Sequence, residues 1–214
     1  MPAIEEETAG TMSALSPAPL ASATEAARDR LRRACASLDL AELTGSPFAM
    51  SQALVEVARS HRELNDEAAA ELHFAAAVRW ARLLGSVDQL AELLCEHADA
   101  AVRVALASEL QVMLSNTVPA GDTGPDEAFA GSTPAGHAAR ERARDRAFEA
   151  SQLVSRVSDP SCEARLLLRV SEVLERCGDH ADALQMQQRA LNRLGGIAPR
   201  DAEWLPALGR LADS

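Results

Sequence analysis

Two windows of this chain carry the same order of large and small residues at the same spacing, which constrains the fold more than any other feature. The first copy comprises Leu54, Val57, Ala58, His61, Ala70, Phe74 and Ala77. The second copy comprises Leu167, Val170, Ser171, Leu174, Ala183, Gln187 and Ala190. A polar turn, Asn65-Asp66 in one copy and Gly178-Asp179 in the other, interrupts each window at the same place. This pattern predicts an antiparallel helix pair, because small residues let two helices approach and large residues fill the grooves between them.

Composition favours helices throughout. Apolar residues make up 47% of the chain, yet aromatic residues make up only 3%, so that Ala and Leu supply most of the hydrophobicity. Strands prefer aromatic and β-branched residues, whereas Ala and Leu favour helices. We therefore expect an all-α protein.

The repeated windows resemble the tetratricopeptide repeat, a helix–turn–helix unit of about 34 residues. The resemblance implies antiparallel hairpins stacked as a short right-handed α-solenoid with flanking helices. It also implies that the first helix of each hairpin forms the inner wall of a concave groove for a peptide or helix of another protein.

Breaks in the apolar periodicity divide the chain into elements. We expect a disordered tail at 1–21, a helical domain at 22–213 and a disordered loop at 118–136, where Pro and Gly concentrate. The first helix should start at Thr24 and end before Gly45. The remaining helices are predicted at 48–64, 67–84, 87–117, 137–158, two within 162–195, and 200–212 with Trp204, Leu208 and Leu211.

The stretch 87–117 leaves two alternatives. It contains neither Gly nor Pro, which allows one long helix, but its Cys-Glu-His-Ala-Asp-Ala string at 95–100 echoes the turn at 177–183. A helix split near His97 is therefore the second alternative. Up-and-down alternation of helices favours one helix, which gives three hairpins and a flanking helix at each end.

No catalytic, cofactor or metal motif is recognisable, so we expect a non-enzymatic protein without cofactor. All 21 basic residues are Arg, which excludes a lysine Schiff base and the P-loop lysine. His61 should be packed in the core, whereas His97 and His180 should lie at turns or on a solvated face. We expect Cys35, Cys95, Cys162 and Cys177 to be reduced and buried.

The resemblance also implies which residues line the peptide-binding groove. In the first strong repeat they are Gln52, Val55, Glu56, Arg59 and Arg62, and in the last they are Arg165, Leu168, Arg169 and Glu172. Arg165 and Arg169 lie at i and i+4, where two guanidinium groups can hold one carboxylate. The alternative is that these arginines pair with nearby acids such as Glu163 and Glu172. The arginine-rich run 140–146 is interleaved with acids and is expected to be a solvated face with ion pairs.

The net charge of −11 disfavours nucleic-acid and anionic-membrane partners. No apolar run approaches the length of a membrane span and the acidic N-terminus is unlike a signal peptide, so a cytoplasmic location is expected. The leading hypothesis is a protein-binding scaffold, adaptor or chaperone, and a homodimer is compatible with the sequence. The narrower version is a bacterial secretion chaperone, because the Lys-free composition resembles GC-rich bacterial coding. The rival hypothesis is a ligand-sensing regulatory module of a signalling or transcription system.

Overall fold

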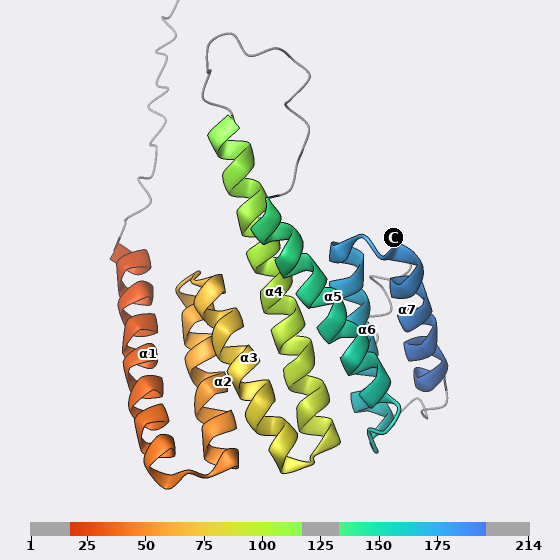
Figure 1. Cartoon of the computed structure of the whole chain (residues 1–214), viewed down its shortest axis with the longest axis horizontal. Helices are drawn as coiled ribbons and strands as arrows, with labels where there is room; N and C mark the ends of the chain where they lie inside the picture. The colour runs from red at the N-terminus through yellow and green to blue at the C-terminus, as the bar shows by residue number, and fades with distance from the viewer. Residues whose placement is uncertain (1–17, 117–132, 196–214) are drawn as a thin grey trace, which may run out of the picture.

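A computed structural model describes residues 18–116 and 133–195, and these form seven α-helices without a strand (Figure 1). The helices are α1 (Ala18–Thr44), α2 (Pro47–Glu63), α3 (Glu67–Leu84), α4 (Val87–Asn116), α5 (Pro134–Val154), α6 (Pro160–Cys177) and α7 (His180–Leu194). The expected all-α class is therefore confirmed for the described part of the chain.

The helices follow one another side by side across the molecule (Figure 1). Each helix packs against the next one in the chain, and α4 also packs against α6. The α4 helix runs unbroken from Val87 to Asn116, so the single-helix alternative is confirmed and the split near His97 is wrong. Figure 1 shows that the C-terminal turns of α4 extend beyond the start of α5.

Short polar turns end the helices where the sequence predicts. Asp66 begins α3 by accepting a hydrogen bond from the backbone N–H of Ala69 at 3.2 Å. Asp159 begins α6 by accepting from two backbone N–H groups, each at 3.1 Å. Gly85 and Gly178 end α3 and α6 with φ of 71° and 88°, a left-handed conformation that glycine adopts without strain.

Two predicted helix starts are wrong. The α1 helix begins at Ala18 instead of Thr24, so the predicted tail 1–21 overlaps the helix by four residues. The α5 helix begins at Pro134 instead of 137, which makes the last three residues of the predicted loop 118–136 helical. The reason is that Pro suits the first helical turn, and the Thr133 side chain accepts a hydrogen bond from the Gly136 N–H at 3.0 Å. The α5 helix also ends at Val154, before the predicted 158. Residues 1–17, 117–132 and the predicted helix 200–212 lie outside the described residues.

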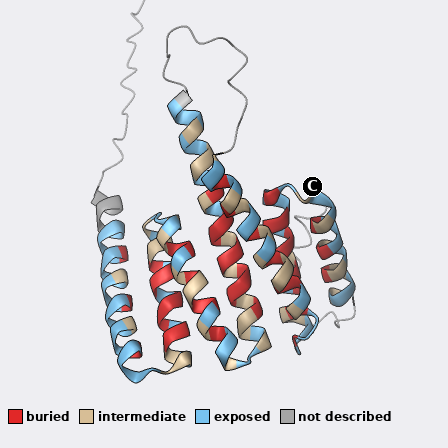
Figure 2. Ribbon diagram, in the orientation of Figure 1, coloured by how far each residue is buried: buried red, intermediate tan, exposed pale blue. Residues whose placement is uncertain are grey.

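The buried residues lie on the facing sides of the helices (Figure 2), and alanines are the most numerous of them, with valines and leucines next in number. Ala70 and Ala183, the small residues at matched positions of the two windows, are 0% and 2% exposed. On α5 the buried stripe comprises Ala139, Ala143, Ala147 and Ala150. The prediction that helices approach one another through alanines is confirmed at these positions.

Several single-residue predictions need correction. His97 is buried on α4 instead of lying at a turn, because the helix continues through it and turns it toward α3 and α5. Cys35 is exposed and Cys162 is half-buried, contrary to the expectation of four buried thiols, whereas Cys95 and Cys177 are buried. His61 is half-buried at the end of α2, where its ring stacks on His73 with 5.3 Å between the ring centroids.

Candidate functional site

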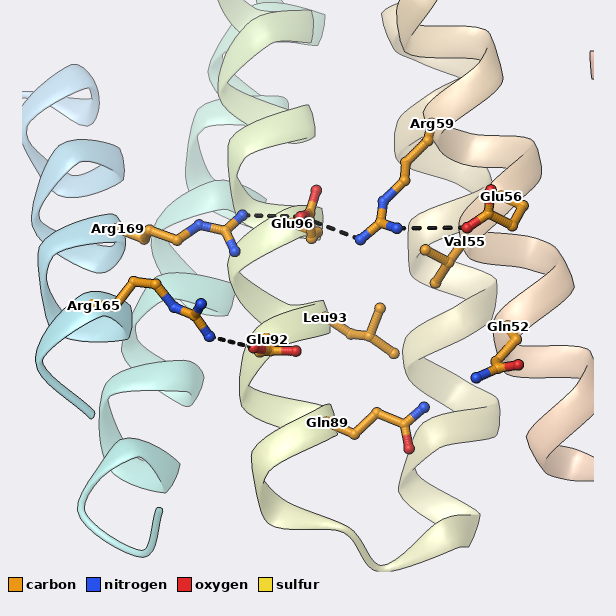
Figure 3. A pocket seen from close by; sticks show the side chains of 10 residues that line it. All are labelled: Gln52, Val55, Glu56, Arg59, Gln89, Glu92, Leu93, Glu96, Arg165 and Arg169. Atoms are coloured by element: carbon orange, nitrogen blue, oxygen red, sulfur yellow. Dashed lines mark hydrogen bonds and ion pairs between the residues drawn. The ribbon is translucent and has the colours of Figure 1, made fainter. Parts of the chain in front are cut away.

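A cavity of about 450 Å³ lies between α2, α4 and α6 (Figure 3). The α2 helix contributes Gln52, Val55, Glu56 and Arg59. The α4 helix contributes Gln89, Glu92, Leu93 and Glu96. The α6 helix contributes Arg165 and Arg169. Side chains from three helices therefore converge on one space, which we call the central cavity.

Six of the nine residues that the sequence assigns to a groove line this cavity, namely Gln52, Val55, Glu56, Arg59, Arg165 and Arg169. The other three lie elsewhere. Arg62 is half-buried, with its guanidinium 4.9 Å from the ring centroid of Phe74. Leu168 is half-buried against the core, and Glu172 lines a smaller neighbouring cavity.

Sequence reasoning missed the four residues of α4. They recur at intervals of three and four residues, which places them on one face of the helix. This spacing could have identified them, because the three hairpins expected from the sequence make 87–117 the first helix of the middle one. The middle hairpin lacks the large-and-small pattern of the other two, so no motif pointed to it.

Glu96 is the electrostatic centre of the site. Its carboxylate lies 3.1 Å from a guanidinium nitrogen of Arg62, 3.2 Å from one of Arg169 and 3.8 Å from one of Arg59. The side chain of Glu96 is 15% exposed, whereas that of Arg59 is 52% exposed. One poorly solvated carboxylate thus links arginines of α2 and α6 to α4, and Figure 3 shows Arg59 and Arg169 reaching it from opposite sides.

The arginine pair of α6 finds its acids on α4. Arg165 donates to Glu92 at 2.8 Å, and Arg169 lies against Glu96. The alternative in the sequence analysis, that these arginines pair with nearby acids, gave Glu163 and Glu172 as examples; the acids are Glu92 and Glu96 instead, and Glu163 accepts a hydrogen bond from Arg193 of α7 at 2.9 Å. The α4 and α6 helices pack together, which brings their charged faces within ion-pair distance.

The central cavity is also lined by uncharged residues. Val55 and Leu93 are 9% and 6% exposed and give the cavity an apolar floor. Gln52 and Gln89 lie on the side of the cavity away from Glu96 (Figure 3). Carboxamides can both donate and accept hydrogen bonds, so this side offers partners for a peptide backbone. The site can hold an apolar side chain between amide and ionic groups.

Two further cavities adjoin the central one. A cavity of about 380 Å³ between α1 and α2 shares Glu56 and Arg59 with it. A cavity of about 140 Å³ between α4 and α6 shares Arg169 with it. The three cavities share lining residues and therefore adjoin one another across α1, α2, α4 and α6; we call this row of cavities the furrow.

The charge balance of the furrow differs from that of the whole chain. Its arginines are Arg30, Arg33, Arg59, Arg103, Arg165, Arg169 and Arg176. Its acids are Glu56, Glu63, Glu92, Glu96, Asp99 and Glu172. Basic groups slightly outnumber acids here, although the chain as a whole has 21 basic and 32 acidic groups. The furrow is therefore less acidic than the chain as a whole.

The arginine run 140–146 is not simply a solvated face with local pairs. Arg142 of α5 donates to Glu71 of α3, and Arg140 and Arg144 pair with Glu109 of α4 and with Asp179 at the start of α7. Arg146 forms a local pair, with Glu149 at 2.6 Å. Three of the four arginines thus connect different helices. Among residues 18–116 and 133–195, no group of three or more His, Cys, Asp or Glu side chains is arranged to hold a metal ion.

Comparisons of the sequence with protein families and with curated proteins identify no relative. No protein family matches the chain, and no curated protein is similar to it in sequence. A solved structure described as "DHF58 filament" is similar over 84% of each chain, with 24% sequence identity and a TM-score of 0.39. Similarity at this level does not indicate a fold or a function. No helix in the described part of the chain is both long and apolar enough to cross a membrane.

Proposed function

We propose that the chain is a non-enzymatic, tetratricopeptide-like helical-repeat protein that binds a segment of another protein in the furrow. In this proposal α2–α3, α4–α5 and α6–α7 are three stacked hairpins of a short right-handed solenoid, with α1 as a flanking helix. The buried positions of Ala70 and Ala183 support an equivalent packing in the first and last hairpins. The first helices of the three hairpins are the ones that line the central cavity.

The adjacency of the three cavities is the observation on which the function rests. An extended peptide or a helix needs more contact area than one pocket offers, and the shared lining residues Glu56, Arg59 and Arg169 place three cavities next to one another. An apolar floor gives an anchoring side chain a place to be buried, while a polar rim can satisfy the groups around it.

The same lining disfavours the ligand-sensing alternative. A sensor of a small apolar molecule needs a concave pocket with mainly hydrophobic walls. Six of the ten residues around the central cavity are charged. We therefore favour an adaptor or chaperone over a ligand-sensing module, and a bacterial secretion chaperone remains the narrower form of the proposal.

Selection from a displayed peptide library on the full chain tests the proposal. The recovered peptides would be synthesised, and their Kd measured by fluorescence anisotropy for the parent chain and for variants. Gln89→Glu alters the cavity wall without removing a side-chain interaction, and Arg169→Glu reverses a charge in it. The matched control is Arg79→Glu on α3, an exposed arginine outside the furrow.

We expect at least one furrow variant to weaken binding about tenfold, which corresponds to about 1.4 kcal/mol, while Arg79→Glu leaves Kd unchanged. Circular dichroism would confirm that each variant is folded. Failure to recover any peptide, or an unchanged Kd in both folded furrow variants, would contradict the proposal.

A further inference from the structure

We propose that residues 1–17, the segment that precedes α1, bind in the α1–α2 part of the furrow and compete there with partner peptides. The competition rests on the proposed function, whereas binding of the segment itself does not. Three observations carry the proposal: the charge of α1, the composition of the segment and the distance between them.

The middle of α1 is basic on an otherwise acidic chain. Between residues 24 and 36 it carries four arginines against two acids. Arg30 and Arg33 border the cavity of about 380 Å³ between α1 and α2, and Arg59 borders it from the α2 side.

The guanidinium groups around this cavity are unevenly neutralised. Arg30 donates to Glu63 at 2.6 Å, whereas Arg59 has two longer ion pairs, with Glu56 at 3.5 Å and with Glu96 at 3.8 Å. Arg33 donates to the backbone oxygen of Asp29 at 3.4 Å, and among the described residues no carboxylate lies within ion-pair distance of it. Arg33 can therefore accept another carboxylate without giving up an ion pair, and Arg59, which is 52% exposed, holds its two acids at the long end of the ion-pair range.

The segment 1–17 has complementary charge. It contains the consecutive acids Glu5, Glu6 and Glu7 and neither Arg nor Lys. The stretch that follows α7, residues 196–214, carries two arginines among three acids and no acidic run. Charge complementarity thus favours the first segment over the last as the occupant of this cavity.

The distance is short enough for the contact to form within one chain. Ala18 follows Glu7 by eleven positions, and such a stretch can span at most about 36–40 Å. Arg30 and Arg33 lie about 18 and 22 Å from Ala18 along the axis of α1 at the helical rise per residue, and neighbouring helices are about 8–10 Å apart. The acids can therefore reach Arg33 on α1 and Arg59 on α2. A tethered segment of this length acts at an effective concentration of about 1 mM, so weak contacts suffice to occupy the cavity.

Photo-cross-linking of the full chain tests this contact without any external peptide. The variant Thr8→p-benzoylphenylalanine places a cross-linker beside the three acids while leaving them intact. After irradiation of a dilute sample, mass spectrometry identifies the residues attached to position 8. We expect attachment within one chain to residues of α1 and α2 that border the cavity.

Reversing the charges on the two sides of the proposed contact tests whether the cross-links depend on ion pairing. Combining Arg33→Glu with Arg59→Glu should lower the yield of these cross-links about fivefold, the size of effect expected from a few exposed ion pairs. Converting Glu5, Glu6 and Glu7 to Arg in that background should restore them. The control Arg79→Glu on α3 should leave the yield unchanged.

Attachment only to α3, α5 or α7, attachment only between chains, or a yield insensitive to the reversal of Arg33 and Arg59 would overturn the proposal. Because no partner peptide is used, these results are independent of whether the furrow binds another protein. For any peptide selected as above, removal of residues 2–17 should lower Kd; an unchanged Kd would overturn the competition while leaving peptide binding established.

Discussion

Arg142 of α5 holds Glu71 of α3 with two parallel hydrogen bonds, from Nε to Oε1 at 2.7 Å and from Nη2 to Oε2 at 3.0 Å. The Glu71 side chain is 11% exposed, and its hydrogen bond raises the pKa of Arg142 above the usual value. This forked pair ties two helices that are not neighbours in the chain to one another beside buried His97.

Removing one partner of this pair should destabilise the fold. We expect Arg142→Ala to lower the free energy of unfolding by about 1–3 kcal/mol, because it leaves a poorly solvated carboxylate without its donors. Urea denaturation followed by circular dichroism measures the change. Arg79→Ala removes an exposed arginine of α3 and should stay within about 0.5 kcal/mol of the parent chain; equal effects of the two substitutions would show that the forked pair contributes nothing.

His97 should make the stability depend on pH. Burial lowers the pKa of His97 to about 4, from its ordinary value of 6.5, and outweighs the attraction of Glu71. The Nε2 atom lies 4.0 Å from the Glu71 carboxylate, which is too far for a hydrogen bond, so the imidazole is neutral near pH 7. Arg142, Arg146 and Glu149 are the other charged groups around it.

The unfolded chain takes up a proton on His97 at a higher pH than the native state does. This residue therefore destabilises the native state progressively as the pH falls from about 6.5 towards 4. Urea unfolding of the parent chain and of His97→Gln at several pH values in this window measures how much His97 contributes to the pH dependence of the unfolding free energy. We expect a shallower loss of stability in the variant; parallel curves would mean that His97 is not buried as a neutral ring.

Ala70 tests the close approach of helices. This residue is 0% exposed, so Ala70→Leu should overpack the contact and cost about 1–3 kcal/mol of unfolding free energy. Cys177→Ser lies beside the turn that ends α6 and should cost less, since its Sγ already lies 3.8 Å from a backbone acceptor, the carbonyl oxygen of Arg140. Thermal unfolding of both variants gives the comparison, and a neutral Ala70→Leu would show that the hairpin register is wrong.

The glycines that follow α6 and α7 differ in backbone conformation, so substituting each by alanine tests the turn geometry. Gly178 has a φ of 88°, in which a side chain is strained, whereas Gly195 has a φ of −64°. We expect Gly178→Ala to cost about 1 kcal/mol, and Gly195→Ala to be neutral or slightly stabilising. Differential scanning calorimetry would reveal the difference in Tm, and a lower Tm for the second variant than for the first would argue against the turn geometry.

Much of the fold can be predicted from the sequence because the signals that start and end its helices are local. Asp66 and Gly85 mark the ends of α3, and the sequence predicted that helix with the bounds the structure has. The concentration of Pro and Gly before Pro134 predicts a loop there. In the structure Thr133 caps the helix and Pro134 is the first residue of α5. Local composition does not separate these two uses of proline unless the capping residue is considered.

The ion pairs were not predictable for a different reason. Arg165 and Glu92 are 73 residues apart in the chain, and Arg142 and Glu71 are 71 residues apart. Their pairing depends on which helices become neighbours, which no local pattern states. Of the four residues of α6 that the repeat resemblance places on the wall, Arg165 and Arg169 line the central cavity, whereas Leu168 and Glu172 do not. The α4 helix lacks the motif, so only the three-dimensional structure reveals its contribution.

The proposal that the furrow binds a segment of another protein is best tested by mapping where a bound peptide lies. A peptide selected on the full chain would carry a photo-reactive residue, and mass spectrometry would identify its attachment sites after irradiation. We expect the peptide to attach to furrow residues of α2, α4 and α6, such as Gln52, Gln89 and Arg165. Attachment confined to the outer faces of α3, α5 or α7 would contradict it.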